Sequence, residues 1–290
     1  MQGSSRPPGD SCPVGRREST TSPAACLSPL TNHRPGTYHG PVPRILALVP
    51  HPDDEAYSVA GTLALAARAG WSCTVIAVSA GEAGRCYTGD AADPAALADL
   101  RLAELARSCA ALGAEPGPSP RLPDGGLARD PRLSDAVAAA IRAAAPDLLL
   151  TIGPDGAYGH PDHLALHRAV VAAVEAAPAP PAVLFAAFPS GLFRPQYDLC
   201  RPILGDPPAI APADLGVERP DVRIPIAAVA DRKLAALAAH ASQLPGGDPA
   251  AIFPPGIVPA LLRDEWFLLR CPADMARVAR LLLDIEAACP

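Results

Sequence analysis

Short apolar runs alternate with helix-like segments along most of this chain, and this alternation restricts the possible folds more than any other feature. The first run, Arg44–Val49, is apolar after its first residue and is followed by Pro50. Such a run is typical of a strand that is buried on both faces in a parallel sheet. A helix over about residues 56–69, stopped by Gly70, and a second strand over 72–78 complete a β-α-β unit.

The same alternation continues along the rest of the chain. A helix is predicted between Asp93, which can cap its first turn, and Gly113, which suits its exit. The proline-rich residues 189–221 have no clear periodicity and are predicted to form loops. The whole pattern predicts an α/β fold, with a doubly wound and mostly parallel sheet and helices on both faces. Further strands are predicted at 147–152, 182–188, 222–226 and 265–270, and further helices at 131–145, 164–177, 234–244 and 275–285.

The composition excludes several classes of protein. Of the 290 residues, 49% are hydrophobic and 19% are charged, which is too apolar for a wholly disordered chain. With a net charge of −6, the chain lacks the excess of basic residues that is typical of nucleic-acid-binding proteins. The chain has no uninterrupted apolar run of about 18 residues, so we expect no membrane span. Eight cysteines occur without a C-x-x-C pair, and we interpret them as reduced thiols of a cytoplasmic protein.

Residues 1–43 differ from the rest of the chain. They are rich in Pro, Ser, Thr and Gly and hold almost no periodic hydrophobic residues, which predicts a disordered extension or an over-long gene start. Arg16-Arg17 and Cys26 faintly resemble export signals, but such signals need an apolar stretch of about 7–15 residues that this segment lacks. Residues 44–290 show no internal repeat and no boundary, and we expect them to form one domain.

Two segments rich in histidine and aspartate follow predicted strands. His51–Glu55, with the sequence HPDDE, comes just after the first strand. His160–His163, with the sequence HPDH, lies in the stretch that follows the strand at 147–152. Open α/β sheets bind their ligands outside the carboxyl ends of the strands, so both segments fall at the edge where a site is expected.

Three side chains of these segments form a metal-ligand set. His51 and Asp54 are three residues apart at a predicted helix start, so their side chains can converge. His163 can reach the same point from a neighbouring strand. Two histidines and one aspartate are typical of a catalytic zinc site, which keeps one position open for water. The alternative is that the aspartates cap helices and the histidines are solvated. This alternative could explain either segment alone, but it explains poorly why two such segments follow strands of one sheet.

The chain resembles the PIG-L/LmbE-like N-acetylglucosaminyl deacetylases, a family that includes deacetylases of the mycothiol and bacillithiol pathways. The resemblance covers about residues 44–270 and rests on the two His-Pro-Asp segments. It implies a Rossmann-like fold. Weaker motifs that add to it are Ala60-Gly61-Thr62, Gly81-Glu82, Arg101-x-x-Glu104, Asp124-Gly125, Tyr158-Gly159 and His240-x-Ser242-Gln243.

The resemblance also implies roles for the residues of the two segments. Zinc would be held by His51, Asp54 and His163. Asp53 would be the general base, and His160 would be its electrophilic or acidic partner. The spacing agrees with these roles, because Asp53 cannot share the direction of Asp54 and His160 projects beside the metal.

The remaining roles concern proton transfer and the substrate. We expect Asp162 to hold the His160 imidazole and to favour its charged form, which could stabilise an oxyanion and protonate the leaving amine. By resemblance, Arg101, Asp124 and Tyr158 would bind the substrate. The alternative for Arg101 is a helix-surface ion pair, and the alternative for Asp124 is a turn position.

Three further positions are open to interpretation. Ala83 stands where thiol-pathway deacetylases often carry a second acid that is implicated in substrate binding, which leaves the sugar undefined. His167 follows His163 by four residues, but the intervening Glu of a zincin is missing, so a core position is favoured over a ligand. His240 is predicted on a helix face, either near the site or without a role in it.

These observations favour a zinc-dependent hydrolase that removes the acetyl group from an N-acetylglucosamine-type amino sugar or its glycoside. One alternative is an amidase that cleaves a larger acyl group, and another is a non-catalytic sugar- or nucleotide-binding α/β module. The expected cofactor is Zn²⁺, with Fe²⁺ as the alternative. The expected partner is a small N-acetylated amino sugar, with no nucleic acid or membrane and with a homo-oligomer left open.

Overall fold

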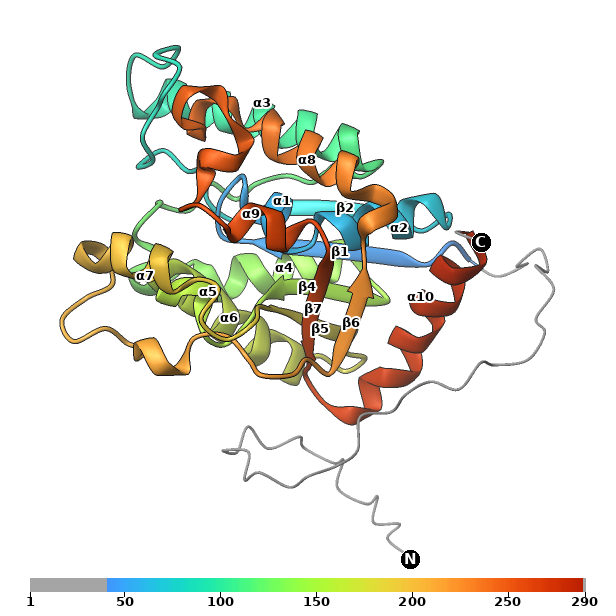
Figure 1. Cartoon of the computed structure of the whole chain (residues 1–290). Coiled ribbons are helices and arrows are strands. Elements are labelled where there is room, and N and C mark those ends of the chain that lie inside the picture. The colour runs from blue at the N-terminus through green and yellow to red at the C-terminus, as the bar shows by residue number, and fades with distance from the viewer. Residues whose placement is uncertain (1–40, 289–290) are drawn as a thin grey trace, which may run out of the picture. The chain divides into compact units, whose positions relative to one another are not determined.

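In a computed structural model that describes residues 41–288, a seven-stranded sheet forms the centre of the described part of the chain (Figure 1). The strands lie in the order β3-β2-β1-β4-β5-β7-β6. Neighbouring strands are parallel from β3 to β5, whereas β7 runs antiparallel to both β5 and β6. The predicted doubly wound, mostly parallel α/β sheet is therefore confirmed. The strands are β1 (Arg44–Val49), β2 (Ser72–Ala77), β3 (Glu115–Pro116), β4 (Leu148–Ile152), β5 (Ala182–Ala187), β6 (Val222–Pro225) and β7 (Asp264–Leu269).

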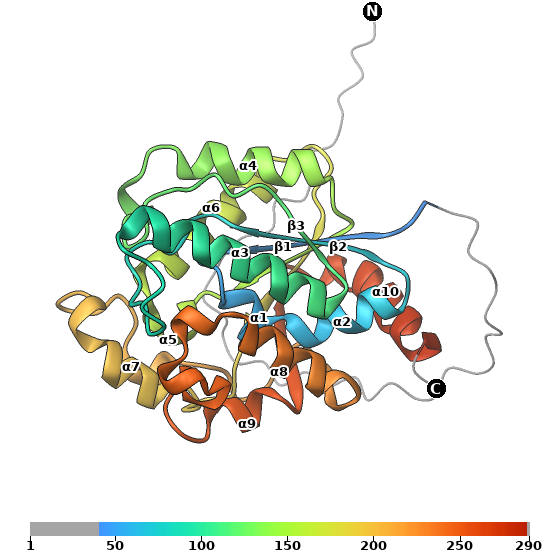
Figure 2. The ribbon, with the colours of Figure 1, turned by 90° about the horizontal axis from the view of Figure 1, so that it is seen from above.

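Helices cover both faces of the sheet, as the alternating residues of β1 illustrate. Ile45, Ala47 and Val49 belong to a hydrophobic core with α2, α3, α8 and α10, whereas Leu46 and Leu48 belong to a core with α4 and α6. Figure 2 shows α4 and α6 on one side of the sheet and α2, α8 and α10 on the other. The helices are α1 (Asp54–Ser58), α2 (Ala60–Arg68), α3 (Pro94–Leu112), α4 (Leu133–Ala144), α5 (Gly156–Gly159), α6 (Pro161–Glu175), α7 (Arg194–Cys200), α8 (Ala230–Ala239), α9 (Ile257–Leu261) and α10 (Met275–Ala288).

The strand order places a switch point between β1 and β4. The chain continues from β1 to β2 and β3 on one side, and from β4 to β5 on the other. The loops that leave these two strands therefore diverge at their carboxyl ends, which is where doubly wound sheets bind ligands. Both His-Pro-Asp segments follow these two strands.

Most predicted elements are present, and several boundaries differ. The Asp93 carboxylate accepts a hydrogen bond from the Ala96 N–H at 2.8 Å, and Gly113 ends α3 with a φ of 75°. The helix predicted over 56–69 is two helices, because Val59 leaves the helical region with a φ of −139°. The predicted loop 189–221 contains the short helix α7.

The limits of the described residues bear on two predictions. Nearly all of the predicted N-terminal extension, residues 1–40, lies outside them, so that prediction stays untested. From Val42 onward, the described residues form one compact unit. Within residues 41–288, no helix has both the length and the hydropathy that a membrane crossing requires.

Candidate functional site

The turn after β1 and the start of α6 bring the predicted metal ligands together. His51 Nδ1 lies 3.1 Å from one carboxylate oxygen of Asp54, and His163 Nε2 lies 3.3 Å from the other. Ligand atoms at about 2.0–2.1 Å from a tetrahedral Zn²⁺ are about 3.3 Å from one another. The spacing of His51, Asp54 and His163 therefore suits a single ion, which agrees with the predicted three-ligand set.

The hydrogen bonds of the two histidines leave the required nitrogens available. His163 Nδ1 lies 3.1 Å from the Gly156 carbonyl oxygen, so Nδ1 carries the proton and Nε2 keeps its lone pair. That Nε2 atom is buried and has no hydrogen-bond partner among the described residues. His51 Nε2 faces two carboxylates, at 3.0 Å from Asp124 and 3.3 Å from Asp162, so its Nδ1 lone pair points toward Asp54. The residues fit a bound metal ion.

Two carboxylates lie behind His51, those of Asp124 and Asp162; the contact of Asp124 with a substrate stays a prediction, whereas the partners of Asp162 differ from the expected one. Asp162 accepts hydrogen bonds from the Gly125 and Leu127 N–H groups, at 2.7 and 3.0 Å, in addition to facing His51. Its carboxylate does not hold the His160 ring, and the expected pairing of these two side chains is wrong. Carboxylates that accept the outer N–H of a metal-binding histidine fix its tautomer and orientation. Asp162 and Asp124 are placed to do this for His51.

The hydrogen bonding of His160 favours a neutral ring, in contrast to the expected imidazolium. The ring caps α6, and its Nδ1 accepts the Asp162 N–H at 3.2 Å, so the proton is on Nε2. Burial, together with the neighbouring rings of His163 and His51, lowers the pKa of His160 to about 3. A helix N-terminus also disfavours a cation. His160 can therefore donate a hydrogen bond from Nε2 without carrying a charge.

Asp53 occupies an unusual backbone conformation beside the metal-ligand set. Its φ is 122°, a region that residues with side chains rarely adopt. One carboxylate oxygen accepts a hydrogen bond from Arg101 at 2.9 Å. Burial raises the pKa of Asp53 to about 6 against the opposing charge of Arg101. A carboxylate with such a pKa suits a general base, whose best pKa lies near the working pH.

Arg101 makes three hydrogen bonds to the protein itself. Besides Asp53, its guanidinium donates to the Pro52 carbonyl at 2.6 Å and to the Gly81 carbonyl at 2.7 Å. The side chain is buried, so the alternative of a helix-surface ion pair is wrong. It lines the cavity of the site, and its predicted contact with the substrate stays a prediction.

Two adjoining cavities open onto the site. The one that we call the inner cavity, of about 430 Å³, is lined by Asp53, Asp54 and His160 among others. The outer one, of about 830 Å³, shares Asp53, Asp54, Tyr158 and Ile203 with it. Tyr158 thus stands where the cavities meet, and its contact with a substrate stays a prediction. Apolar and aromatic side chains on the wall of the outer cavity are Tyr87, Leu199, Pro202, Ile203, Ile252 and Phe253.

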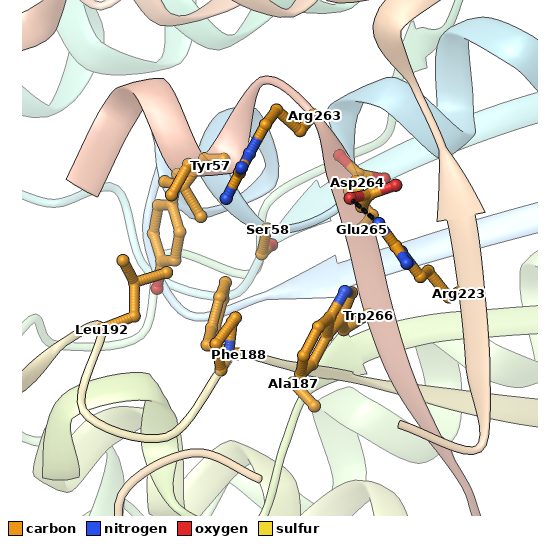
Figure 3. Close-up of a pocket in the computed structure, with 13 residues that line it drawn as sticks. Tyr57, Ser58, Ala187, Phe188, Leu192, Arg223, Arg263, Asp264, Glu265 and Trp266 are labelled. Carbon is orange, nitrogen blue, oxygen red and sulfur yellow. Dashed lines mark hydrogen bonds and ion pairs between the residues drawn. The ribbon is translucent and has the colours of Figure 1, made fainter. Parts of the chain in front are cut away.

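A separate cavity of about 150 Å³ lies at the carboxyl end of β5, beside α1 (Figure 3). Tyr57, Phe188 and Trp266 line it, and Arg223 pairs with Asp264 at its edge. None of the predicted site residues lines this cavity. We therefore place the functional site in the two larger cavities.

Two histidines outside the ligand set have clear positions. His167 is half-buried, its Nδ1 lies 3.1 Å from the Ile152 carbonyl oxygen and its ring packs on Phe185, so it lies outside the ligand set, as predicted. His240 is fully buried and its Nε2 lies 2.7 Å from a carboxylate oxygen of Glu55. Sequence reasoning left His240 undecided and did not pair it with Glu55. The position of Glu55 within the HPDDE segment was the one available signal.

Comparisons with known proteins agree with this geometry. Residues 46–174 match the family described as PIG-L: GlcNAc-PI de-N-acetylase. The chain is 37% identical over 243 residues to the 1D-myo-inositol 2-acetamido-2-deoxy-alpha-D-glucopyranoside deacetylase of Nakamurella multipartita, with 70% of this chain and 81% of that protein covered. An enzyme of the same name from Rhodococcus jostii is 32% identical over 279 residues, with 78% and 91% covered.

A solved structure supports the same assignment of the fold. A conserved protein from Thermus thermophilus superimposes with a TM-score of 0.51 and 26% identity, and the match covers 79% of this chain and 94% of that chain. Fold, ligand spacing and sequence similarity all converge on one conclusion: the chain belongs to the PIG-L family of de-N-acetylases.

Proposed function

We propose that this protein is a zinc-dependent deacetylase that hydrolyses the N-acetyl group of an N-acetylglucosamine-type amino sugar or its glycoside. The observation that carries this proposal is the buried set of His51, Asp54 and His163 with Asp53 beside it at the cavity floor. Two nitrogen donors and one carboxylate favour zinc, and Fe²⁺ is the alternative ion. The relatives named above act on a 2-acetamido-2-deoxy-glucopyranoside of inositol, which makes such glycosides the first substrates to test.

The residues around the metal-ligand set divide the chemistry among them. A bound Zn²⁺ would acidify a water molecule and polarise the amide carbonyl. Asp53 accepts the proton of the attacking water, while Arg101 holds one of its oxygens in place. His160 donates a hydrogen bond from Nε2 to the carbonyl oxygen as negative charge develops there. The C–N bond then breaks, and the proton held by Asp53 passes to the leaving amine.

The test combines metal analysis with detection of the product. Purified protein is expected to contain one divalent ion per chain and to release a primary amine and acetate from the inositol glycoside of N-acetylglucosamine. His163→Ala is expected to lose most of the metal and the activity together. Full metal retention in His51→Ala and His163→Ala, or amine release by protein stripped of metal, would overturn the proposal.

The outer cavity supports a second candidate, an amidase for a larger acyl group. Its wall carries Leu199 and Ile203, whose side chains are exposed, and it adjoins Asp53 and Asp54. An acyl chain longer than acetyl could lie along this wall. Rates measured on glucosamine with N-acetyl, N-butanoyl and N-octanoyl groups distinguish the two candidates, because a deacetylase prefers the first and the amidase prefers a longer chain.

We further propose that the protein works in the cytoplasm. Five cysteines of the described part of the chain are free: Cys73, Cys86, Cys109, Cys200 and Cys271. Unpaired thiols are typical of a reducing compartment. Cell fractionation with an antibody against the protein tests this location.

A further inference from the structure

The strained backbone of Asp53 needs an explanation that the metal ligands do not provide. Asp53 precedes α1 with a φ of 122° and a ψ of −25°. Such a conformation persists only where the surrounding structure fixes it. Arg101 holds the carboxylate of Asp53 and the carbonyl of Pro52. The Asp53 N–H donates to a carboxylate oxygen of Glu55 at 3.1 Å.

Glu55 gathers hydrogen bonds from three separate parts of the chain. One carboxylate oxygen accepts from Ser108 in α3 at 2.6 Å and faces His240 Nε2 at 2.7 Å. The other oxygen accepts the Asp53 N–H. The Glu55 side chain is fully buried and lines neither cavity of the site. Glu55 is thus unavailable to a substrate, and its carboxylate is fully used in holding its neighbours.

His240 is anchored in turn. It is fully buried where α8 gives way to the 3₁₀ turn Ala241–Gln243. Two residues later, the N–H and hydroxyl of Ser242 donate to Glu104 in α3, at 2.7 and 2.6 Å. The end of α8 is therefore fixed to α3, and it presents His240 to Glu55 at a fixed place.

We propose that Glu55 and His240 are positioning residues that hold Asp53 in its strained conformation, with its carboxylate in the cavity beside the metal-ligand set. His240 orients the Glu55 carboxylate, and Glu55 binds the N–H of Asp53. Neither residue touches a substrate. The inference rests on the proposed function for the role of Asp53 as proton acceptor, but the conformation of Asp53 can be tested without it.

The structural test compares Glu55→Met with a matched control, Glu104→Met, because Met has a similar length and no acceptor oxygen for the Asp53 N–H. Both positions carry a buried glutamate that binds the 3₁₀ turn or its flanking histidine, but only Glu55 contacts Asp53. In crystal structures, Asp53 is expected to leave the positive-φ region in Glu55→Met and to keep it in Glu104→Met. Retention of the strained φ in Glu55→Met would overturn the proposal, whatever the substrate proves to be.

The kinetic test asks whether the pair acts through Asp53. Glu55→Met and His240→Leu are expected to keep the metal and a KM within about twofold, while kcat falls about 10- to 100-fold, a fraction of what a general base contributes. His240→Gln, which keeps an N–H donor near the position of Nε2, is expected to restore most of the rate. Equal losses in Glu104→Met, loss of the metal, or no rescue by His240→Gln would show a merely structural role.

The two kinds of failure can be told apart. If the wild-type protein releases no amine from any N-acetylated amino sugar, the proposed function fails, and the crystal structures alone decide on the positioning pair. If the wild-type protein is active and Glu55→Met has normal kcat with bound metal, the positioning pair fails and the proposed function stands.

Discussion

Asp53 and Asp54 are chemically identical neighbours with opposite surroundings. Asp54 lies between His51 and His163, whereas Asp53 is held by Arg101 and faces the cavity. Asp54→Asn is therefore expected to lose metal and activity together. Asp53→Asn is expected to keep the metal while kcat falls about 10²–10⁴-fold with KM little changed, because only the proton acceptor is removed. Metal analysis and steady-state kinetics of the two variants check this.

Near-normal kcat in metal-loaded Asp53→Asn would mean that another group takes the proton. Two further acids, Glu55 and Asp155, are poorly placed to do so. Glu55 is buried and hydrogen-bonded on both oxygens, and Asp155 accepts from the N–H groups of Ala157 and Gly216. Neither lines the two cavities of the site.

The buried pair of His240 and Glu55 predicts a pH dependence of stability. Burial lowers the pKa of His240, but Glu55 outweighs it and the pKa is raised above 6.5. Burial raises the pKa of Glu55, but His240 outweighs it and the pKa falls below 4.5. The contribution of protonated His240 to the free energy of unfolding is complete below pH 6.5 and is lost as the pH rises through the raised pKa of His240. The contribution of ionised Glu55 is complete above pH 4.5 and is lost as the pH falls through the lowered pKa of Glu55.

The stability advantage of the wild-type protein over His240→Gln is therefore expected to be greatest between pH 4.5 and 6.5 and to shrink on either side. Urea unfolding at a series of pH values measures it. A difference between the two proteins that is constant from pH 4 to 9 would contradict an ionised pair.

At the scale of single residues, spacing predicts the metal ligands but not their environment. His51 and Asp54 are three residues apart, and His163 follows the neighbouring strand, so local geometry and sheet topology suffice to bring them together. The true partners of the Asp162 carboxylate are residues that are distant in sequence, such as Gly125 and Leu127. No local pattern shows such contacts.

At the scale of elements, a buried ion pair joins α1 to α2. Lys233, the one lysine of the sequence, donates to the Tyr57 carbonyl at the end of α1 at 2.7 Å and pairs with Glu265 at 2.5 Å. Glu265 accepts the N–H groups of Gly61 and Thr62 in the first turn of α2, at 2.8 and 2.7 Å. The break at Val59 is thus stabilised on both sides by side chains from α8 and β7.

Removing one partner of this pair should be more costly than altering both. Lys233→Met leaves the Glu265 carboxylate buried without its cation, and we expect it to destabilise the protein by about 3–5 kcal/mol. The double variant Lys233→Met/Glu265→Gln is expected to lose less, since it buries no unpaired charge and Gln can still accept a hydrogen bond from α2. Urea unfolding of the three proteins measures the difference. A double variant less stable than Lys233→Met would contradict this account.

The boundaries that sequence reasoning missed share a physical cause. The apolar spacing from Leu234 to Leu244 is compatible with one helix, but α8 ends at Ala239 and a 3₁₀ turn follows. There the contacts of His240 with Glu55, and of the following turn with α3, override local propensity. Helix α7 has only seven residues, too few for the periodic pattern that identifies longer helices.

At the scale of the whole molecule, the alternation of strands and helices predicts the sheet, and the sheet predicts the place of the site. The order of β7 and β6 at one edge, and the antiparallel direction of β7, have no signature in the sequence. They depend on how distant segments pack. The switch point between β1 and β4 does not depend on the placement of β6 and β7. The site could therefore be located from the sequence although the placement of these two strands could not be predicted.

Metal binding at this switch point should stabilise the molecule as a whole. The proposed ligands come from the turn after β1, the first residue of α1 and the first turn of α6, so an ion would tie neighbouring parts of the sheet together. A ligand present at 100 times its Kd adds about 2.7 kcal/mol, and 1 kcal/mol moves Tm by about 2–4 °C in a domain of this size. Treatment with EDTA is therefore expected to lower Tm by about 5–10 °C, and added Zn²⁺ should restore it. His163→Ala serves as the control, because its Tm should respond little to either treatment. A wild-type Tm that is unchanged by EDTA, in protein shown by metal analysis to be stripped, would mean that the ion contributes nothing to holding these strands together.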